Sequence, residues 1–120
     1  MDEGRTMERR MNRGDIWLID LGGRIGTRPV VIITRQNVLE YLNKVIVAEI
    51  TTQGKGYPTE IYINQKANLP KPSFIQADNI HTVLKKRLEK YVGTLDPATM
   101  LEVSRKVVLA LELEDCLYET

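Results

Sequence analysis

The sequence has too few cysteines and histidines to build a disulfide framework or a usual zinc site. Cys116 is its only cysteine and His81 is its only histidine. A single cysteine excludes an intramolecular disulfide, and zinc sites normally combine several cysteine, histidine or carboxylate ligands. These absences lead us to expect a protein of the reducing cytoplasm without a metal site.

Long apolar runs and internal repeats are also missing. No apolar run approaches the ~20 residues that cross a bilayer, and the charged start of the chain lacks the apolar stretch of a signal peptide. The 120 residues are 42% apolar and 28% charged, which is typical of a globular domain and argues against disorder. We expect residues 1–12 to be a flexible N-terminal extension and residues 13–120 to form a single domain.

The small net charge of +1 conceals an uneven distribution along the chain. Residues 96–120 contain six acids and two bases, which gives −4, whereas residues 1–95 contain fifteen bases and ten acids, which gives +5. A basic body with an acidic C-terminal segment suggests that an anionic ligand contacts the body. Two solvated charged surfaces would give the same distribution, so charge alone leaves both interpretations open.

The hydrophobic pattern predicts short strands followed by one helix. Alternating or β-branched runs indicate strands at residues 16–21, 30–34, 45–50, 60–63, 73–77, 80–84 and 88–93. Loops are expected at 22–26 and 53–58, and a short helix at 36–42. Asp96 and Pro97 begin the last helix. Its expected apolar face comprises Met100, Val103, Val107 and Leu111. The predicted fold class is mainly β (β + α), a small bent sheet or barrel with a C-terminal amphipathic helix.

The strands at 30–34 and 45–50 carry the most informative polar residues. Strands adjacent in sequence usually pair, and the register that sets Thr34 opposite Val45 also sets Arg28 opposite Thr51. This register makes one hairpin face apolar, whereas a slip by one residue would put polar groups into the core. The apolar face comprises Pro29, Val31, Ile33, Ile46, Ala48 and Ile50. The other face carries Arg28, Thr34, Glu49 and Thr51 among valines and Ile32.

A guanidinium beside a hydroxyl and a carboxylate suits the binding of a phosphate. Arg28 can bind phosphate oxygens through two N–H groups and can stabilise charge that develops on them. We expect Glu49 to orient Arg28. A surface Arg–Glu pair beside an uninvolved threonine would leave the same trace in the sequence, so these residues alone leave that alternative open.

Seven short segments, taken together and in order, resemble a known family. They are Arg-Gly-Asp-Ile-Trp at 13–17, Arg-Pro-Val-Val-Ile at 28–32, Val-Ile-Val-Ala-Glu-Ile-Thr at 45–51, Pro-Thr-Glu-Ile at 58–61, Asp-Asn-Ile-His-Thr at 78–82, Arg-Leu at 87–88 and Gly-Thr-Leu at 93–95. No segment is specific by itself, but the ordered set resembles the MazF/PemK family of toxin endoribonucleases.

The resemblance implies an SH3-like barrel of the MazF/CcdB type, working as a homodimer, without a cofactor, and neutralised by a cognate MazE-like antitoxin. It implies metal-independent, sequence-specific cleavage of single-stranded RNA to 2′,3′-cyclic phosphate and 5′-hydroxyl ends, which inhibits translation and growth. Arg28 and Thr51 fall on the family's two catalytic positions. Arg28 is expected to move protons and stabilise the transition state, and Thr51 to hydrogen-bond the scissile phosphate. The RNA's own 2′-hydroxyl is the expected nucleophile.

Five further residues are expected to contact RNA. Asn79 falls where the family often has an RNA-contacting glutamine, and a general-acid or base-stacking role suits His81. Lys85 begins a Lys-Lys-Arg run that suits backbone phosphates, and we add Gln53 and Arg24 to the set. An ordinary polar strand position for His81 and a solvated turn at the basic run are alternatives that the sequence leaves open.

One segment departs from the family pattern, and two other functions compete with the first. Residues 22–27 form a shorter loop than in many members and contain no acid, which leaves the RNA sequence preference open. A gyrase poison of the CcdB type is the second hypothesis, but that activity goes with a Trp-Gly-Ile ending, and this chain ends Cys-Leu-Tyr-Glu-Thr. A non-catalytic SH3-like binding module is the third, although the seven aromatic residues are scattered.

Overall fold

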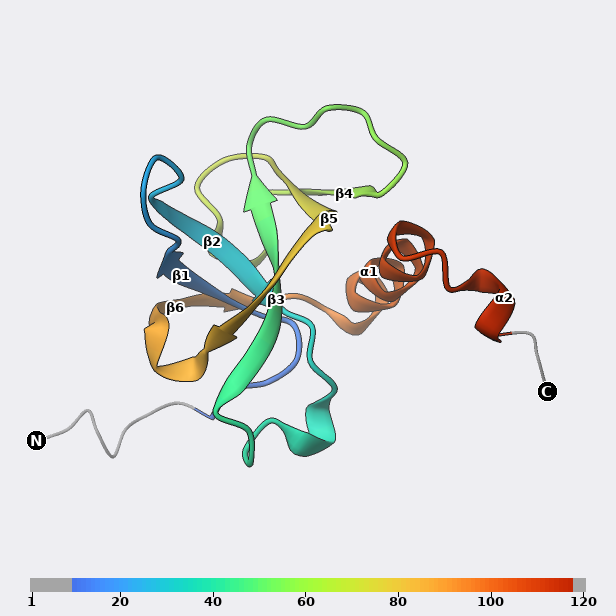
Figure 1. The fold of residues 1–120 in the computed structure, drawn as a ribbon. Coiled ribbons are helices and arrows are strands. Elements are labelled where there is room, and N and C mark those ends of the chain that lie inside the picture. The colour runs from blue at the N-terminus through green and yellow to red at the C-terminus, as the bar shows by residue number, and fades with distance from the viewer. Residues whose placement is uncertain (1–9, 118–120) are drawn as a thin grey trace, which may run out of the picture.

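Six antiparallel strands form one sheet in the order β4-β5-β3-β2-β1-β6 (Figure 1). The structure is a computed structural model that describes residues 10–117. The strands are β1 (Asp15–Asp20), β2 (Thr27–Ile32), β3 (Lys44–Thr51), β4 (Glu60–Asn64), β5 (Ser73–Leu84) and β6 (Leu88–Thr94). The predicted mainly β class is confirmed, because the alternating and β-branched runs do form the strands.

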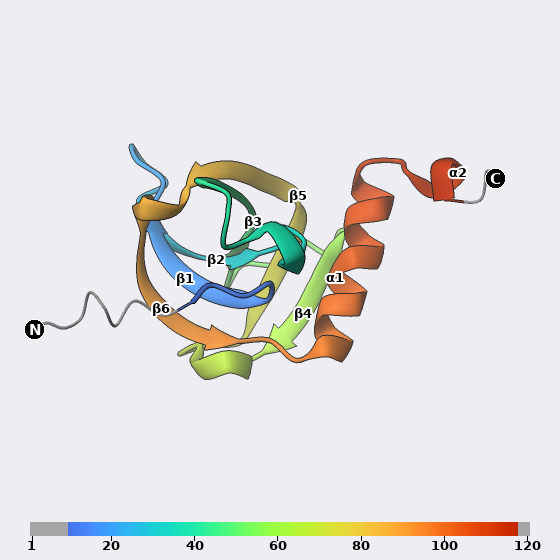
Figure 2. The ribbon, with the colours of Figure 1, turned by 90° about the horizontal axis from the view of Figure 1, so that it is seen from below.

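The sheet curls until its two edges meet, which makes a barrel (Figure 2). The 3-10 turn η2 (Lys66–Asn68), which follows β4, lies against β6. The Asn68 side-chain amide donates a hydrogen bond of 3.0 Å to the carbonyl oxygen of Val92. A Cβ atom on Gly93 would lie only 2.2 Å from the carbonyl oxygen of Ala67. The approach of the two edges therefore depends on glycine at position 93.

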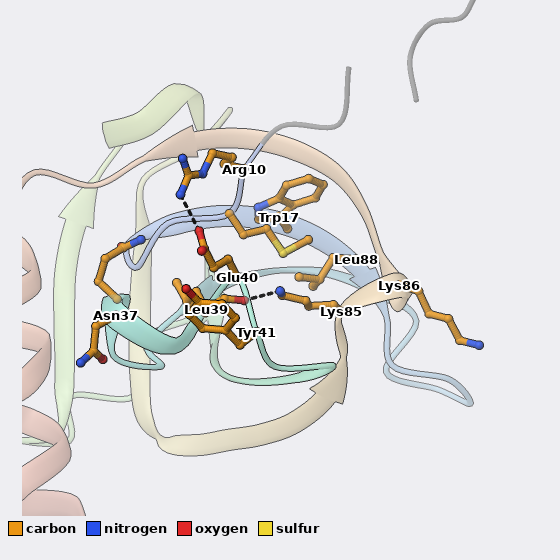
Figure 3. A pocket seen from close by; sticks show the side chains of 11 residues that line it. Arg10, Trp17, Asn37, Leu39, Glu40, Tyr41, Lys85, Lys86 and Leu88 are labelled. Carbon is orange, nitrogen blue, oxygen red and sulfur yellow. Dashed lines mark hydrogen bonds and ion pairs between the residues drawn. The ribbon is translucent and has the colours of Figure 1, made fainter. Parts of the chain in front are cut away.

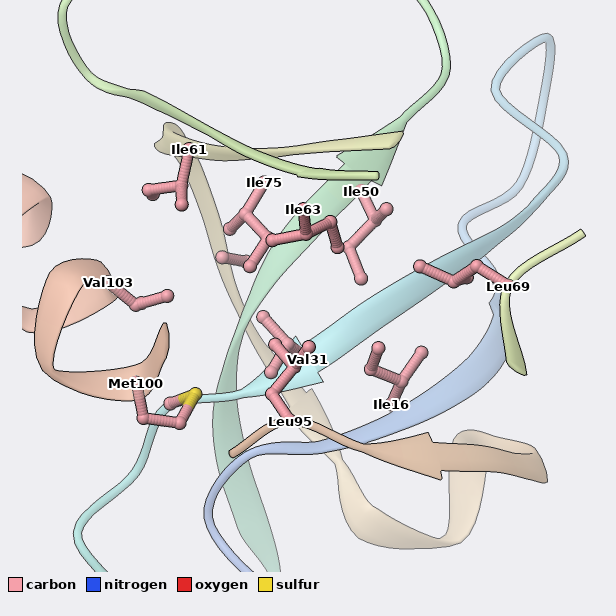
Figure 4. Close-up of a cluster of buried hydrophobic side chains, with 11 residues drawn as sticks. Ile16, Val31, Ile50, Ile61, Ile63, Leu69, Ile75, Leu95, Met100 and Val103 are labelled. Carbon is pink, nitrogen blue, oxygen red and sulfur yellow. The ribbon is translucent and has the colours of Figure 1, made fainter. Parts of the chain in front are cut away.

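Two clusters of buried side chains fill the domain. The first joins the strands to the C-terminal helix (Figure 4) and comprises Ile16, Val31, Ala48, Ile50, Ile61, Ile63, Leu69, Ile75, Leu95, Met100 and Val103. The second comprises Trp17, Ile19, Val30, Ile32, Leu39, Val45, Val47 and Leu88. The hairpin is thus largely apolar on both faces along its middle, apart from Glu49 opposite Val30, and Arg28 and Thr51 lie near the strand ends. Ile46, predicted to lie in the core, is 40% exposed because it lies beyond the end of β2, outside both clusters.

The C-terminal helix α1 (Pro97–Ala110) begins as predicted, with Asp96 at the N-cap and proline in the first turn. Met100 and Val103 project into the first cluster (Figure 4), and Val107 packs against it. Leu111 was expected on the same face, but it is 49% exposed because the helix has ended at Ala110. A short helix α2 (Glu114–Leu117) follows.

A hydrogen bond from Thr99 holds the first turn of α1. The Thr99 hydroxyl donates to the Asp96 carboxylate at 2.5 Å, and the Lys66 ammonium lies 3.5 Å from the same oxygen. The hydroxyl above all, with a smaller contribution from Lys66, keeps the pKa of Asp96 below its ordinary value. Because its pKa is lower in the folded protein, the ionised Asp96 carboxylate stabilises the folded state.

Two predicted elements differ from the structure. The strands expected at 73–77 and 80–84 are one strand, β5, which bulges between them and continues. The helix expected at 36–42 is only the 3-10 turn η1 (Gln36–Val38), followed by turns. So short a segment gains little from helical hydrogen bonds, and burial of Leu39 holds it instead. A third 3-10 turn, η3 (Lys85–Arg87), connects β5 to β6.

The start of the described chain already contacts the barrel. Met11 packs against the second cluster, and the Arg10 guanidinium lies 2.7 Å from the Glu40 carboxylate. The flexible extension predicted for residues 1–12 falls mainly on residues 1–9, which lie outside the described residues. Within residues 10–117, none of the helices is both long and apolar enough to span a bilayer.

Candidate active site

The observed β2–β3 ladder has the register that the sequence predicts. It pairs Val30 with Glu49, Val31 with Ala48 and Ile32 with Val47. Continued by two residues, this register sets Arg28 near the start of β2 opposite Thr51 at the end of β3. Directly opposed residues in an antiparallel pair share a face, so both side chains point to the same side of the sheet.

Arg28 and Thr51 line one open groove of about 480 Å³. Its walls come from β2, β3, β5 and the loops on either side. The lining residues are Ile25, Arg28, Pro29, Glu49, Ile50, Thr51, Thr52, Gln53, Lys55, Ser73, Gln76 and Asn79. The groove thus combines two cations, several hydroxyls and amides, and one carboxylate.

Both central side chains are ready to take an external ligand. Arg28 is exposed, and no hydrogen bond or ion pair within residues 10–117 engages its side chain. The Thr51 hydroxyl oxygen accepts a hydrogen bond of 3.0 Å from the backbone N–H of Gln53. This bond fixes the oxygen and leaves the hydroxyl proton to be donated elsewhere. A fixed hydroxyl donor beside a free guanidinium suits a phosphate group.

Glu49 does not orient Arg28 as the sequence suggested. Its carboxylate oxygen Oε2 lies 2.5 Å from Nε2 of His81 on the neighbouring strand. The Glu49 side chain is 16% exposed and that of His81 is 34% exposed, and of the two only Glu49 lines the groove. Because Val47 lies opposite His81, the imidazole and Glu49 share one face of β3 and β5, which explains their contact.

A β-bulge in β5 shapes the wall of the groove beside Glu49. The β3–β5 ladder pairs Ala48 with Ile80 and then Glu49 with Gln76, so residues 77–79 have no partner in β3. Asn79, an expected RNA contact, thereby lines the groove, and its side-chain N–H donates to the Gln76 amide oxygen at 3.0 Å. Bulges often redirect side chains next to active sites in this way.

The other expected RNA contacts lie in three different places. Gln53 lines the groove two residues after Thr51. Arg24 is exposed in the β1–β2 turn, next to Ile25, which lines the groove. His81 does not line the groove but contacts Glu49, which does.

Lys85 is not brought to the groove. It lines a separate pocket of about 860 Å³, walled by Trp17, Leu39, Leu88 and the η1 and η3 segments (Figure 3). Its ammonium donates a hydrogen bond to the carbonyl oxygen of Leu39. That bond ties η3 to the turn after η1, which is a structural contact. A direct role for Lys85 in RNA binding therefore stays a prediction without support from this geometry.

The sequence interpretation missed the polar groove residues Thr52, Lys55, Ser73 and Gln76, of which two add a charge or an amide. Lys55 adds a second cation from the loop after β3, and Gln76 adds an amide from β5. A lysine four residues after Thr51 is a signal that the sequence did offer. Gln76 offered none, because its approach to the groove depends on the bulge. Across the described residues, no three histidine, cysteine or acidic side chains gather where they could hold a metal ion.

The fold and the groove together define a small helix-capped barrel whose open polar groove suits a phosphodiester. A family model described as PemK-like, MazF-like toxin of type II toxin–antitoxin system matches residues 12–111. This chain belongs to that toxin family, as its seven segments suggested, and the CcdB-type alternative is thereby set aside.

Relatives of known name and structure agree with the family. The chain is 35% identical over 113 residues to Endoribonuclease MazF of Staphylococcus epidermidis, covering 88% of this chain and 94% of the relative. A solved endoribonuclease from Mycobacterial species in complex with its cognate antitoxin has a TM-score of 0.77 at 29% identity, covering 86% of this chain and 96% of that one. Mycobacterium tuberculosis toxin MazF-mt6 has a TM-score of 0.75 at 30% identity, covering 82% and 96%.

Proposed function

We propose that this chain is a toxin endoribonuclease that cleaves single-stranded RNA without a metal ion, leaving 2′,3′-cyclic phosphate and 5′-hydroxyl ends. One observation carries the proposal: the β2–β3 register gathers Arg28 and Thr51 in one open groove. Family membership and relatives named endoribonuclease support the enzyme class.

The groove suits attack by the 2′-oxygen of the RNA on its own neighbouring phosphate. The scissile phosphate would sit between Arg28 and Thr51. The guanidinium fork binds two phosphate oxygens and stabilises the charge that grows on them as the 2′-oxygen adds. The Thr51 hydroxyl, fixed by the Gln53 N–H, donates to a phosphate oxygen. Because the nucleophile belongs to the substrate, the protein's main contribution is positioning and electrostatic stabilisation.

Polar side chains around this centre would hold the RNA strand. Lys55 and Arg24 offer charge to backbone phosphates, and Gln53 and Asn79 offer amides to base edges. Amides in a groove are suited to reading unpaired bases, so we assign sequence preference to this part of the site. Residues 13–120 would form a single MazF-like toxin domain.

The cellular role follows from the family. We propose that the toxin acts on RNA in the cytoplasm, inhibits translation and growth, and works as a homodimer neutralised by a MazE-like antitoxin. A solved relative is a complex of an endoribonuclease with its cognate antitoxin, which supports a protein antitoxin here. The basic body, +5 over residues 1–95, would attract an acidic antitoxin segment.

The test is cleavage of a long single-stranded RNA by the purified protein in EDTA, with chemical analysis of the ends. We expect cuts at a short recurring sequence with 5′-hydroxyl ends. Arg28→Ala should lower the rate by about 100-fold or more, because it removes the main charge that stabilises the transition state. Arg35→Ala is the matched control, since Arg35 is also exposed but lies outside the groove.

Three results would contradict the proposal. Folded wild-type protein that cuts none of several varied RNAs would favour the binding-module alternative. Cleavage that requires added Mg²⁺ would refute metal independence. Equal rates for Arg28→Ala and Arg35→Ala would remove Arg28 from the chemistry.

A further inference from the structure

Glu49 is the only carboxylate among the described residues that line the groove. Its side chain is 16% exposed, so the charge is kept largely away from bulk water at a place where a phosphate is to bind. A carboxylate there repels an anionic ligand. Its presence in the groove therefore suggests that it has a chemical role in the reaction. Transfer of a proton from the attacking 2′-hydroxyl is a task that the proposed reaction needs and that the other lining residues do not provide.

The remaining lining side chains cannot take that proton. The family resemblance leads us to expect that Arg28 moves protons, but its charged guanidinium, like the ammonium of Lys55, can only donate a proton because it has no acceptor lone pair. Threonine and serine hydroxyls and the amides of Gln53, Gln76 and Asn79 are very weak bases. Within the lining set, elimination leaves the Glu49 carboxylate.

The position of Glu49 fits the task. It lies two residues before Thr51 on β3, so it points to the same face, at a spacing of roughly 7 Å along the strand. It lies opposite Val30 and therefore diagonal to Arg28, which is two residues away on β2. A ribose whose phosphate sits between Arg28 and Thr51 can thus present its 2′-hydroxyl to the neighbouring carboxylate.

His81 holds this carboxylate in one orientation. A carboxylate only accepts hydrogen bonds, so Nε2 of His81 is the donor in the 2.5 Å contact to Oε2. The contact occupies Oε2, and no hydrogen bond to the other oxygen, Oε1, is found within residues 10–117. Arg28 from β2 and Lys55 from the loop after β3 are the charged groups that line the groove around the pair.

We propose that Glu49 is the general base of the reaction and that His81 is a positioning residue acting through it; this inference rests on the function proposed above. Oε1 takes the proton of the 2′-hydroxyl while the 2′-oxygen forms its bond to phosphorus and the bond from phosphorus to the 5′-oxygen breaks. The 5′-oxygen leaves as a hydroxyl after it takes a proton from water. Glu49 then returns its proton to water, so no proton is gained or lost overall.

The first test compares Glu49→Gln with wild type in single-turnover cleavage from pH 4 to 9. Glutamine keeps the shape and can still accept the His81 hydrogen bond, but it is a very weak base. We expect the rate to fall about 100-fold or more while RNA affinity, measured by filter binding of a 2′-deoxy-substituted analogue, changes less than about threefold. The fall in rate at acid pH, caused by protonation of the base, should disappear or move. Glu89→Gln, an exposed carboxylate on β6, is the matched control.

Chemical rescue separates a proton-transfer role from a structural one. Glu49→Ala should be slow, and added formate should restore part of the rate in proportion to its concentration, whereas chloride should not. For His81, alanine should lower the rate by about 10–100-fold because the carboxylate loses its fixed orientation. His81→Gln, which restores an N–H donor, should recover part of that loss and shift the acid side of the pH profile.

The outcomes distinguish this inference from the proposed function. Wild-type cleavage together with a Glu49→Gln rate and pH profile like those of Glu89→Gln would overturn the assignment and leave the ribonuclease intact. Equal losses of cleavage and RNA affinity in Glu49→Gln would make Glu49 a binding residue and also overturn it. Failure of the wild-type protein to cut RNA would instead refute the underlying function. Circular dichroism of each variant establishes that it folds.

Discussion

Closure of the barrel at Gly93 gives the most direct test of the fold. Replacing Gly93 by alanine would place a Cβ atom 2.2 Å from the carbonyl oxygen of Ala67 and 2.7 Å from its carbonyl carbon. Ordinary contacts of this kind begin at 3.4 Å. Backbone must therefore move by roughly 1 Å, because no flexible side chain is available to absorb the clash.

The expected loss of stability combines two terms. Overpacking of this kind costs about 1–3 kcal/mol. Displacement of η2 also endangers the 3.0 Å hydrogen bond from Asn68 to Val92, which contributes about 1 kcal/mol. Alanine offsets a small part, about 0.4–1 kcal/mol, by restricting the unfolded chain. We therefore expect Gly93→Ala to lower the free energy of unfolding by about 1–3 kcal/mol.

Gly54→Ala is the matched control for this experiment. Its added Cβ would lie 2.8 Å from the Phe74 ring, but a partly exposed ring can move aside where backbone cannot. Urea unfolding at one fixed protein concentration, followed by fluorescence of the single, buried Trp17, measures both variants. If the unfolding midpoint of Gly93→Ala equals that of Gly54→Ala, the two edges do not meet as described.

The remaining predictions concern the site and the helix. Thr51→Val should lower the cleavage rate by about 100-fold, because valine keeps the shape but cannot donate to the phosphate. Thr82→Val, exposed on β5, should cleave normally, and equal rates for the two variants would refute the role of Thr51. Asp96→Asn should be less stable than wild type at pH 7, since asparagine keeps the shape and can accept from the Thr99 hydroxyl but lacks the charge. The lowered pKa of Asp96 means that its contribution is complete above the ordinary value of 3.8 and is lost as the pH falls below it. Thermal unfolding from pH 7 to pH 2.5 should therefore show the two proteins converging, and a constant difference would contradict this origin.

Some features of this barrel could be predicted from residues that are neighbours in the sequence. The paired strands at β2 and β3 could be aligned because a strand alternates with a period of two, and the register that sets Thr34 opposite Val45 groups Arg28, Glu49 and Thr51 on one face. The start of α1 could be read from Asp96 and Pro97, since capping preferences depend on neighbouring residues alone. The end of α1 could not, because Leu111 continues the helical spacing after the backbone has left the helix.

The sequence by itself thus determined strands β2 and β3, their register and the meeting of Arg28 with Thr51, because each follows from periodicity within one hairpin. Only the tertiary structure decided the partner of Glu49, the entry of Asn79 and Gln76 into the groove, and the separation of Lys85 from it. Those outcomes depend on where β5 bulges as it crosses β3 and on how η3 folds back toward η1. Such contacts join residues far apart in the chain, and their geometry is set by closure of the whole barrel. Local sequence preferences do not predict that closure.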